Sequence, residues 1–198
     1  MPADCFRNRA ESQNVLQLTG ELRHSGPMAT RSQLQQALET YQATVREASA
    51  SGNWNLFASL FTADADYNEH AYGRFRGRDR IAAWAVRTMT TFPGSSMVEF
   101  PVAWSVLDPE RGWIVCEIRN LMADPGDGSV HETPNLTILH LADDGSDGLF
   151  RYEEDVYNPV NFGQMVAAWA RVADRHGRLP DEGREWLRRF VPGWESVA

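Results

Sequence analysis

An acidic side chain among aromatic residues is the first candidate for chemistry in this sequence. Glu69 follows Tyr67 in a segment that alternates polar and apolar residues like a β-strand. A carboxylate that such a strand directs into an apolar pocket has its charged form disfavoured, which raises its pKa towards the working range of a general base. Glu69 is therefore a candidate proton-transfer group. The alternative is a Glu at a strand edge, in water or paired with an Arg of residues 74–80.

Two histidines offer a second kind of chemistry. His70 is adjacent to Glu69, and His140 stands between Leu139 and Leu141. Paired with a carboxylate, either could act as an acid–base group, and the simpler alternative is a hydrogen-bonded structural histidine. Neither an H-x-H nor an H-E-x-x-H spacing occurs, so we expect no metal site.

The composition indicates a globular chain with an acidic balance. The 198 residues suffice for one domain with a buried core, and 19 Arg against 27 Asp and Glu give a net charge of −8. An acidic chain repels phosphate backbones, so we expect no nucleic-acid partner. No apolar run approaches the length of a membrane helix, and the N-terminus lacks a signal-peptide core. Cys5 and Cys116 make no disulfide framework, and we expect a cytoplasmic location.

The first half of the chain predicts helices with one strand among them. Residues 1–30 show no steady hydrophobic period, and we expect a disordered tail there. A helix follows from Ser32 and ends at Gly52, because apolar residues recur at steps of three and four: Leu34, Leu38, Tyr41, Val45 and Ala48. We then expect a short helix over 54–61, a strand over 67–71, a loop over 73–79 with Asp79 as helix cap, and a third helix from Ile81 to Met89.

The second half predicts four strands bounded by turn residues, over 97–107, 113–122, 130–141 and 149–157. The short turns between them favour an antiparallel meander. Two helical segments, around Trp169 and Trp186, complete the chain. This order predicts an α+β fold in residues 31–160, with helices packed on one face of a curved, mainly antiparallel sheet, and a C-terminal helical extension in 161–198.

This order of elements resembles the nuclear-transport-factor-2-like, or SnoaL-like, superfamily, which includes ketosteroid isomerases, limonene-epoxide hydrolases and polyketide cyclases. The resemblance covers about residues 34–162. It rests on Gly52-Asn-Trp-Asn, Leu60-Phe61, Asp64-Ala65, Tyr67, Gly77-Arg-Asp-Arg-Ile81 and Glu154-Asp155-Val-Tyr157-Asn-Pro. It implies a cone-shaped domain with an apolar pocket, and a homodimer formed through the outer face of the sheet.

The match to ketosteroid isomerases is partial. Aligned from Leu60-Phe61, Glu69 stands at the general base of that family, where the family has Asp. The family places a Tyr of its oxyanion hole where this chain has Val45, and Tyr41 lies one turn earlier on the same helix face. The second donor, an Asp in the family, has no match in the segment Pro134-Asn-Leu-Thr-Ile138. The resemblance thus implies a base without its usual partners.

The match to limonene-epoxide hydrolases is also partial. Asp155 matches an Asp that those enzymes use in activating water and protonating the epoxide, and Tyr67 matches a water-holding Tyr. Ile118 and Asn120 occupy the places of the family's Arg and Asp. Arg119 is one residue away, and a shift of one residue puts a side chain on the other face of a strand. Asn120 could still hold a water.

Periodicity and resemblance disagree about Asp155. Apolar residues Phe150, Tyr152 and Val156 alternate with a polar set, Arg151, Glu153, Asp155 and Tyr157. The alternation alone turns Asp155 outward, whereas the resemblance turns it into the pocket. Both hold if a dimer buries the outer face and the polar set lines a cavity.

We therefore expect an enzyme without cofactor that acts on a small hydrophobic molecule, such as a polyketide, terpenoid or steroid-like ring, by isomerisation, cyclisation or hydration. Glu69 would be the base, Asp155 a second acid–base group, and Tyr67 and Asn120 would orient water or substrate. The expected substrate pocket is lined by Tyr41, Val45, Trp84, Ile118, His140 and Tyr157, although the helical spacing of Trp84 also suits a plain core. The competing expectation is a non-catalytic binding or dimerisation module, with its cavity filled by aromatic residues and both carboxylates on the surface.

Overall fold

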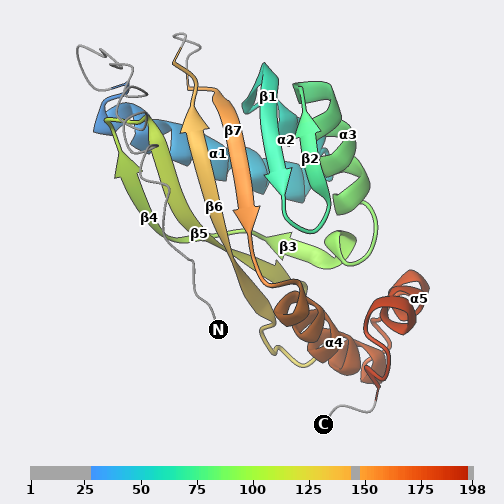
Figure 1. Cartoon of the computed structure of the whole chain (residues 1–198). Helices are drawn as coiled ribbons and strands as arrows, with labels where there is room; N and C mark the ends of the chain where they lie inside the picture. Colours follow the sequence, from blue (N-terminus) through green and yellow to red (C-terminus); the bar gives the residue numbers. More distant parts are fainter. Residues whose placement is uncertain (1–27, 144–147, 196–198) are drawn as a thin grey trace, which may run out of the picture.

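The structure is a computed structural model that describes residues 28–143 and 148–195, so the tail expected over residues 1–30 lies almost wholly outside the described residues. A seven-stranded sheet forms its centre, with helices on one face (Figure 1). Three helices lie in the first half of the chain: α1 (Arg31–Ser51), α2 (Asn55–Ala58) and α3 (Arg78–Met89). None of the described helices is long and apolar enough to cross a membrane.

Helix α1 follows the predicted apolar stripe, whose five residues are all buried. Thr30 and Gln33 begin the helix with a capping box, in which the Thr30 hydroxyl accepts the Gln33 amide and the Gln33 side chain accepts the Thr30 amide. Gly52 ends it at a φ of 70°, a left-handed conformation that costs glycine little. The predicted boundaries of this helix are confirmed.

The sheet is mixed but mainly antiparallel, and the predicted α+β class is confirmed. Its strands are β1 (Phe61–Glu69), β2 (Gly73–Arg76), β3 (Met97–Glu99), β4 (Val102–Asp108), β5 (Trp113–Met122), β6 (Glu132–Leu141) and β7 (Phe150–Val156). The order is β2-β1-β7-β6-β5-β3, with β4 also paired to β5. Among the strands of the described residues, only β1 and β7 run parallel, and this pairing joins the first strand to the last.

Three predicted elements are wrong in detail. The strand expected over 97–107 is broken at Phe100-Pro101, because Pro101 has no amide to donate to the ladder; its carbonyl instead accepts the Arg119 amide. The helix expected over 54–61 is only Asn55–Ala58, since Phe61 already starts β1. The loop expected over 73–79 contains β2, and Gly77, not Asp79, stands at the N-cap of α3.

The C-terminal helices, α4 (Pro159–Arg175) and α5 (Asp181–Phe190), lie beyond one end of the sheet (Figure 1). They form a second apolar cluster with Met122 of β5 and with Phe92 and Met97, which flank the short 3-10 helix Gly94–Ser96. The Trp169 indole donates to the Ala123 carbonyl at 2.6 Å and ties α4 to the end of β5. This contact holds α4 beside the end of β5.

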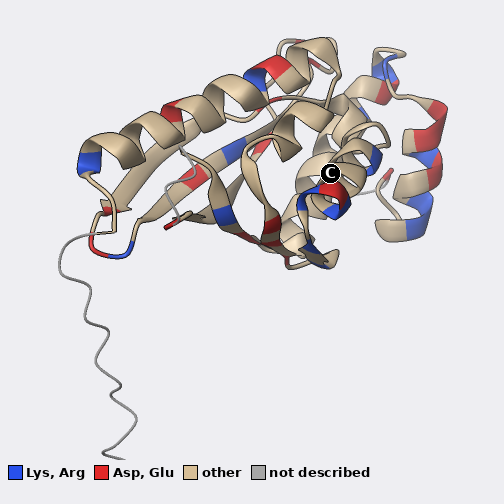
Figure 2. Ribbon diagram, turned by 90° about the horizontal axis from the view of Figure 1, so that it is seen from above, with Lys and Arg blue, Asp and Glu red and all other residues tan. Residues whose placement is uncertain are grey.

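Charges of both signs are interspersed on α5 at the edge of the molecule (Figure 2). Asp181 and Glu182 occupy the first turn, and Arg188 and Arg189 the last, which matches the helix dipole at both ends.

Candidate active site

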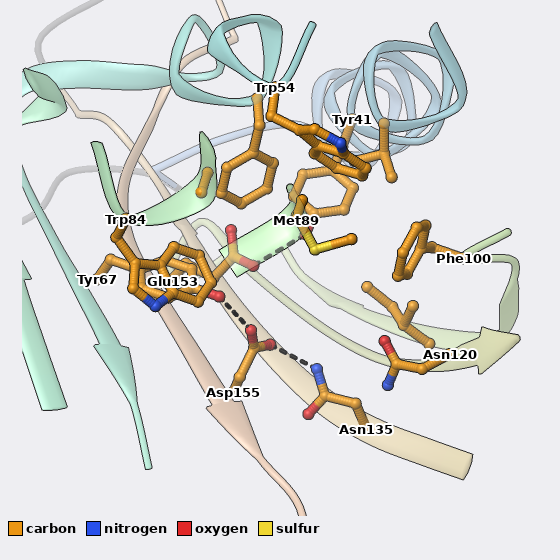
Figure 3. Close-up of a pocket in the computed structure, with 14 residues that line it drawn as sticks. Tyr41, Trp54, Tyr67, Trp84, Met89, Phe100, Asn120, Asn135, Glu153 and Asp155 are labelled. Atoms are coloured by element: carbon orange, nitrogen blue, oxygen red, sulfur yellow. Dashed lines mark hydrogen bonds between the residues drawn. The ribbon is translucent and has the colours of Figure 1, made fainter. Parts of the chain in front are cut away.

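A cavity of two joined chambers lies between the helices and the inner face of the sheet (Figure 3). The inner chamber, of about 110 Å³, is bounded by Tyr41 and Val45 of α1, Trp54, and Phe57 of α2. The outer chamber, of about 120 Å³, reaches Glu69, the segment from Thr91 to Met97, and Phe162 of α4. Both chambers share six lining residues, Trp84, Met89, Phe100, Asn120, Asn135 and Asp155, so they adjoin each other.

Asp155 is buried at the junction of the chambers and accepts hydrogen bonds from three side chains. The Tyr67 hydroxyl donates to Oδ2, while Asn135 Nδ2 and Thr137 Oγ1 donate to Oδ1 at 2.7 and 2.6 Å. Burial raises the pKa of Asp155, and the three hydrogen bonds, led by that from Thr137, partly offset this effect because they favour the ionised form. Its orientation is the one that the resemblance implied and not the one that simple alternation predicted.

The register of the sheet explains this orientation. Asp155 stands opposite Glu69 on β1 and Thr137 on β6, and Glu153 stands opposite Tyr67. Directly opposed residues point to the same face of a sheet, so these side chains share the inner face that α1 and α3 cover.

Glu153, which the sequence analysis did not select, is the most deeply buried carboxyl of the site. It is 1% exposed, and its Oε1 accepts the Tyr41 hydroxyl at 2.9 Å. Its Oε2 makes no hydrogen bond with the described residues. Burial, and next the negative charge of Asp155, hold the pKa of Glu153 well above its ordinary value, although the Tyr41 hydrogen bond opposes the shift. Glu153 is two residues from Asp155, and residues two apart on a strand point to the same face. The sequence could therefore have placed Glu153 in the pocket together with Asp155.

Glu69 lines the outer chamber and is 3% exposed. Its Oε2 accepts the backbone amides of Ala71 and Tyr72, so the carboxylate also closes the turn between β1 and β2. Burial raises its pKa, while hydrogen bonds from Tyr157 and the two amides lower it in part. No ion pair joins Glu69 to an Arg among the described residues; Arg74 lies nearer to Asp66, at 3.9 Å.

Six of the other predicted pocket residues line one or both chambers. Val45, Tyr41 and Ile118 line the inner chamber, Tyr157 lines the outer one, and Trp84 and Asn120 line both. The Asn120 amide lies 3.5 Å from the Thr133 carbonyl, a weak contact that leaves it able to bind a ligand.

The prediction that His140 lines the pocket is wrong. It lies on the outer face of β6, between the rings of Trp113 and Tyr152 with centroids 4.2 and 4.5 Å away, and it lines neither chamber. Burial in this aromatic stack lowers the pKa of His140 to about 4. The alternation of Leu139, His140 and Leu141 could not distinguish the faces, because both faces of β6 carry apolar residues.

Unpaired polar atoms gather at the cavity. Within residues 28–143 and 148–195, six buried side-chain polar atoms have no hydrogen-bond partner, and four of them belong to cavity-lining residues: Trp84 Nε1, Thr88 Oγ1, Asn135 Oδ1 and Glu153 Oε2. Buried polar atoms without partners are rare because each costs about 1–3 kcal/mol. Their concentration here is typical of a ligand site. No group of three or more His, Cys, Asp or Glu suited to a metal ion occurs among the described residues.

Comparison with solved structures confirms the expected SnoaL-like fold. A putative SnoaL-like polyketide cyclase from Jannaschia sp. CCS1 is 15% identical with a TM-score of 0.52, over 69% of this chain and 92% of that chain. The BvnE pinacolase from Penicillium brevicompactum is 15% identical with a TM-score of 0.51, over 70% and 93%. TerC, co-crystallised with polyporic acid, is 13% identical with a TM-score of 0.51, over 67% and 97%. No protein-family model matches the sequence, and no similar curated protein is found.

Proposed function

We propose that this chain, which shares the fold of a SnoaL-like polyketide cyclase, is an enzyme that moves protons on a small hydrophobic molecule without a cofactor. Isomerisation, cyclisation and hydration are the reaction types that this chemistry allows. Among the relatives by fold, BvnE is a pinacolase and TerC was crystallised with polyporic acid, and both descriptions fit a small organic ligand in the cavity.

The observation that carries the proposal is the position of Asp155. Among the described residues it is the one carboxyl that lines both chambers, and its three donors favour a charged carboxylate inside walls that are otherwise largely apolar. A carboxylate held in an apolar site is a stronger base than in water, because burial raises its pKa. We assign proton abstraction to Asp155 and its orientation to Tyr67.

Glu69 and Asn120 complete the proposed set. Glu69 is the second proton-transfer group, placed in the outer chamber, where burial raises its pKa. Asn120 faces both chambers and would orient water or the substrate. Trp84, Val45, Tyr41, Ile118 and Tyr157 would provide the walls that hold an apolar ring.

Proton abstraction can be tested without knowing the natural substrate. Enolisable ketones such as cyclohexanone and 2-indanone exchange their α-protons for deuterium in D₂O, which proton NMR follows. We expect the protein to accelerate this exchange and Asp155→Asn to lower the acceleration by about 10²- to 10⁴-fold, the usual contribution of a general base. Asp66→Asn, on β1 but on the outer face, is the matched control and should exchange normally.

The alternative is a non-catalytic binding module of the same fold. It is favoured by the protein's own hydrogen bonds, since both oxygens of Asp155 and Oε2 of Glu69 already accept internal donors. If ketones bind in the cavity but neither the wild type nor any variant exchanges their protons, the binding module is correct and the enzyme proposal is wrong.

A further inference from the structure

Aromatic rings surround the inner chamber on several sides. The aromatic residues that line it come from separate elements of the chain: Tyr41, Trp54, Phe57, Tyr67, Trp84 and Phe100. Figure 3 shows Trp84 and Tyr67 on one side of the space, Phe100 on the other, and Trp54 and Tyr41 above it. The face of an aromatic ring carries negative potential, so walls of this kind attract an organic cation.

Carboxyl groups complete the walls and bring negative charge without a cation. Glu153 and Asp155 line the inner chamber, and Glu69 lines the adjoining outer one. Within the described residues no Arg or His lines either chamber, and no ion pair includes any of the three carboxyls. Burial raises the pKa of all three, because charge in this cavity is poorly compensated. A bound cation would supply the missing compensation.

The carboxyl oxygens are placed to act on a ligand through their charge and not through hydrogen bonds. Both oxygens of Asp155 accept internal donors, and Glu153 Oε1 accepts the Tyr41 hydroxyl. Glu153 Oε2 has no partner among the described residues, but it lies beneath the surface of the chamber. A primary ammonium would therefore lose its hydrogen bonds to water without replacing them. A quaternary ammonium has no N–H to satisfy, and its charge still acts on Asp155 across a short distance.

The size of the chambers limits the shape of this ligand. The inner chamber, of about 110 Å³, is smaller than a cavity of about 150 Å³ that holds benzene in another protein, so it suits a compact head group. The outer chamber, of about 120 Å³, adjoins it at Trp84 and Asp155 and can take a short chain attached to that group.

We propose that the inner chamber binds a trimethylammonium group, whose methyl groups pack on the aromatic rings while its charge is balanced by Asp155. This inference goes beyond the proposed function, because it concerns what the cavity binds and applies equally to an enzyme and to a binding module. The remainder of the ligand extends into the outer chamber.

Three small probes test the proposal directly. Choline carries the trimethylammonium group, 3,3-dimethylbutanol is its neutral analogue of the same shape, and ethanolamine is the primary ammonium counterpart. In NMR titrations of the full chain, we expect choline to bind about tenfold or more tighter than either of the other two. The methyl signal of bound choline should also move upfield, because the surrounding rings shield it. Equal or tighter binding of 3,3-dimethylbutanol would overturn the proposal, and so would equal binding of ethanolamine.

A charge variant tests the role of Asp155. Asp155→Asn keeps the shape of the side chain but removes its charge, so the preference for choline over 3,3-dimethylbutanol should fall to about threefold or less. Glu154→Gln is the matched control, because it removes the same charge from the opposite face of β7 and should keep the full preference. A full preference in folded Asp155→Asn would show that Asp155 does not balance the cation. Circular dichroism establishes that each variant is folded.

The aromatic walls can be tested without changing their shape. Biosynthetic replacement of tryptophan by fluorotryptophan reduces the negative potential on the ring faces of Trp54 and Trp84, which both line the inner chamber. Choline should then bind more weakly, whereas 3,3-dimethylbutanol should bind as before. An equal loss for both probes would mean that the rings act only as an apolar wall, and it would contradict the proposal. This test remains available if Asp155→Asn does not fold.

The choline titration and the α-proton exchange assay fail independently of each other. A preference for choline without ketone exchange would support the cation site and refute the proposed enzyme. Ketone exchange without any preference for choline would retain the enzyme and refute the cation site.

Discussion

Glu153 and Asp155 stand two residues apart on one face of β7, and the surrounding donors are divided unequally between them. Within the described residues, Asp155 receives three hydrogen bonds, whereas Glu153 receives one and has an oxygen without a partner. Two nearby carboxyls in an apolar site cannot both ionise easily, and the donors determine which one keeps the charge. This unequal division leaves the pKa of Glu153 well above its ordinary value, whereas the three donors favour the ionised form of Asp155.

The first prediction concerns Glu69. Glu69→Gln retains an oxygen that can accept the Ala71 and Tyr72 amides, so the thermal midpoint of unfolding should change little. If Glu69 transfers protons, exchange or turnover should fall by about 10²-fold or more. Asp66→Asn again serves as the control. Full turnover in Glu69→Gln would reduce Glu69 to a turn-stabilising residue and leave Asp155 as the base.

The second prediction concerns the hydrogen bond from Tyr67 to Asp155. Tyr67→Phe removes a donor that favours the ionised carboxylate, so the pKa of Asp155 should rise further. The acid limb of the kcat/KM profile should then move to higher pH, and the free energy of unfolding should fall by about 1–3 kcal/mol. Tyr152→Phe, whose hydroxyl contacts Glu154 on the outer face, should leave the limb in place. An unmoved acid limb in Tyr67→Phe would mean that Asp155 does not control the profile.

The third prediction concerns the dependence of stability on pH. Because the pKa of Glu153 is well above its ordinary value of 4.5 in the folded chain, the unfolded chain releases this proton first as the pH rises. The contribution of Glu153 to the free energy of unfolding is fully present below pH 4.5 and is lost as the pH rises through the folded pKa. The loss amounts to about 1.4 kcal/mol per pH unit between the two values.

Glu153→Gln should lack this loss, so its stability relative to the wild type should increase with pH. Urea unfolding over about pH 5 to 8 measures the difference. Glu154→Gln provides the contrast, since hydrogen bonds from Tyr152 and His70 lower the pKa of Glu154. Parallel stability curves for Glu153→Gln and the wild type would show that Glu153 is ionised in the folded chain.

The fourth prediction concerns assembly. Trp104 and Val106 on β4 are 45% and 59% exposed and pair with Glu117 and Val115 across the sheet, on the face opposite the cavity. An exposed apolar strand face of this kind is typical of an interface, and we expect a homodimer formed there. Val106→Asp should shift the mass measured by light scattering from dimer to monomer. Val130→Asp, equally apolar but outside the strands, should not. A wild-type monomer at all concentrations would contradict the prediction.

Much of the site could be predicted because local patterns position it. The stripe from Leu34 to Ala48 determines which face of α1 meets the sheet, so Tyr41 and Val45 were expected at the pocket, and both line it. The alternation around Tyr67 likewise placed Tyr67 and Glu69 on one face of β1. His140 could not be placed in this way, because its strand carries apolar residues on both faces and only the surrounding sheet shows which face the helices cover.

The sequence by itself determined the fold class, the main helices and most strand ends, since hydrophobic period and turn residues act over a few neighbouring positions. Only the tertiary structure decided which tyrosine hydroxyl each carboxyl of β7 accepts. The contacts from Tyr67 to Asp155 and from Tyr41 to Glu153 join residues 88 and 112 positions apart. They form because β7 pairs in parallel with β1 and turns its polar face towards the helices. A strand's alternation defines two faces, but packing against other elements chooses the buried one.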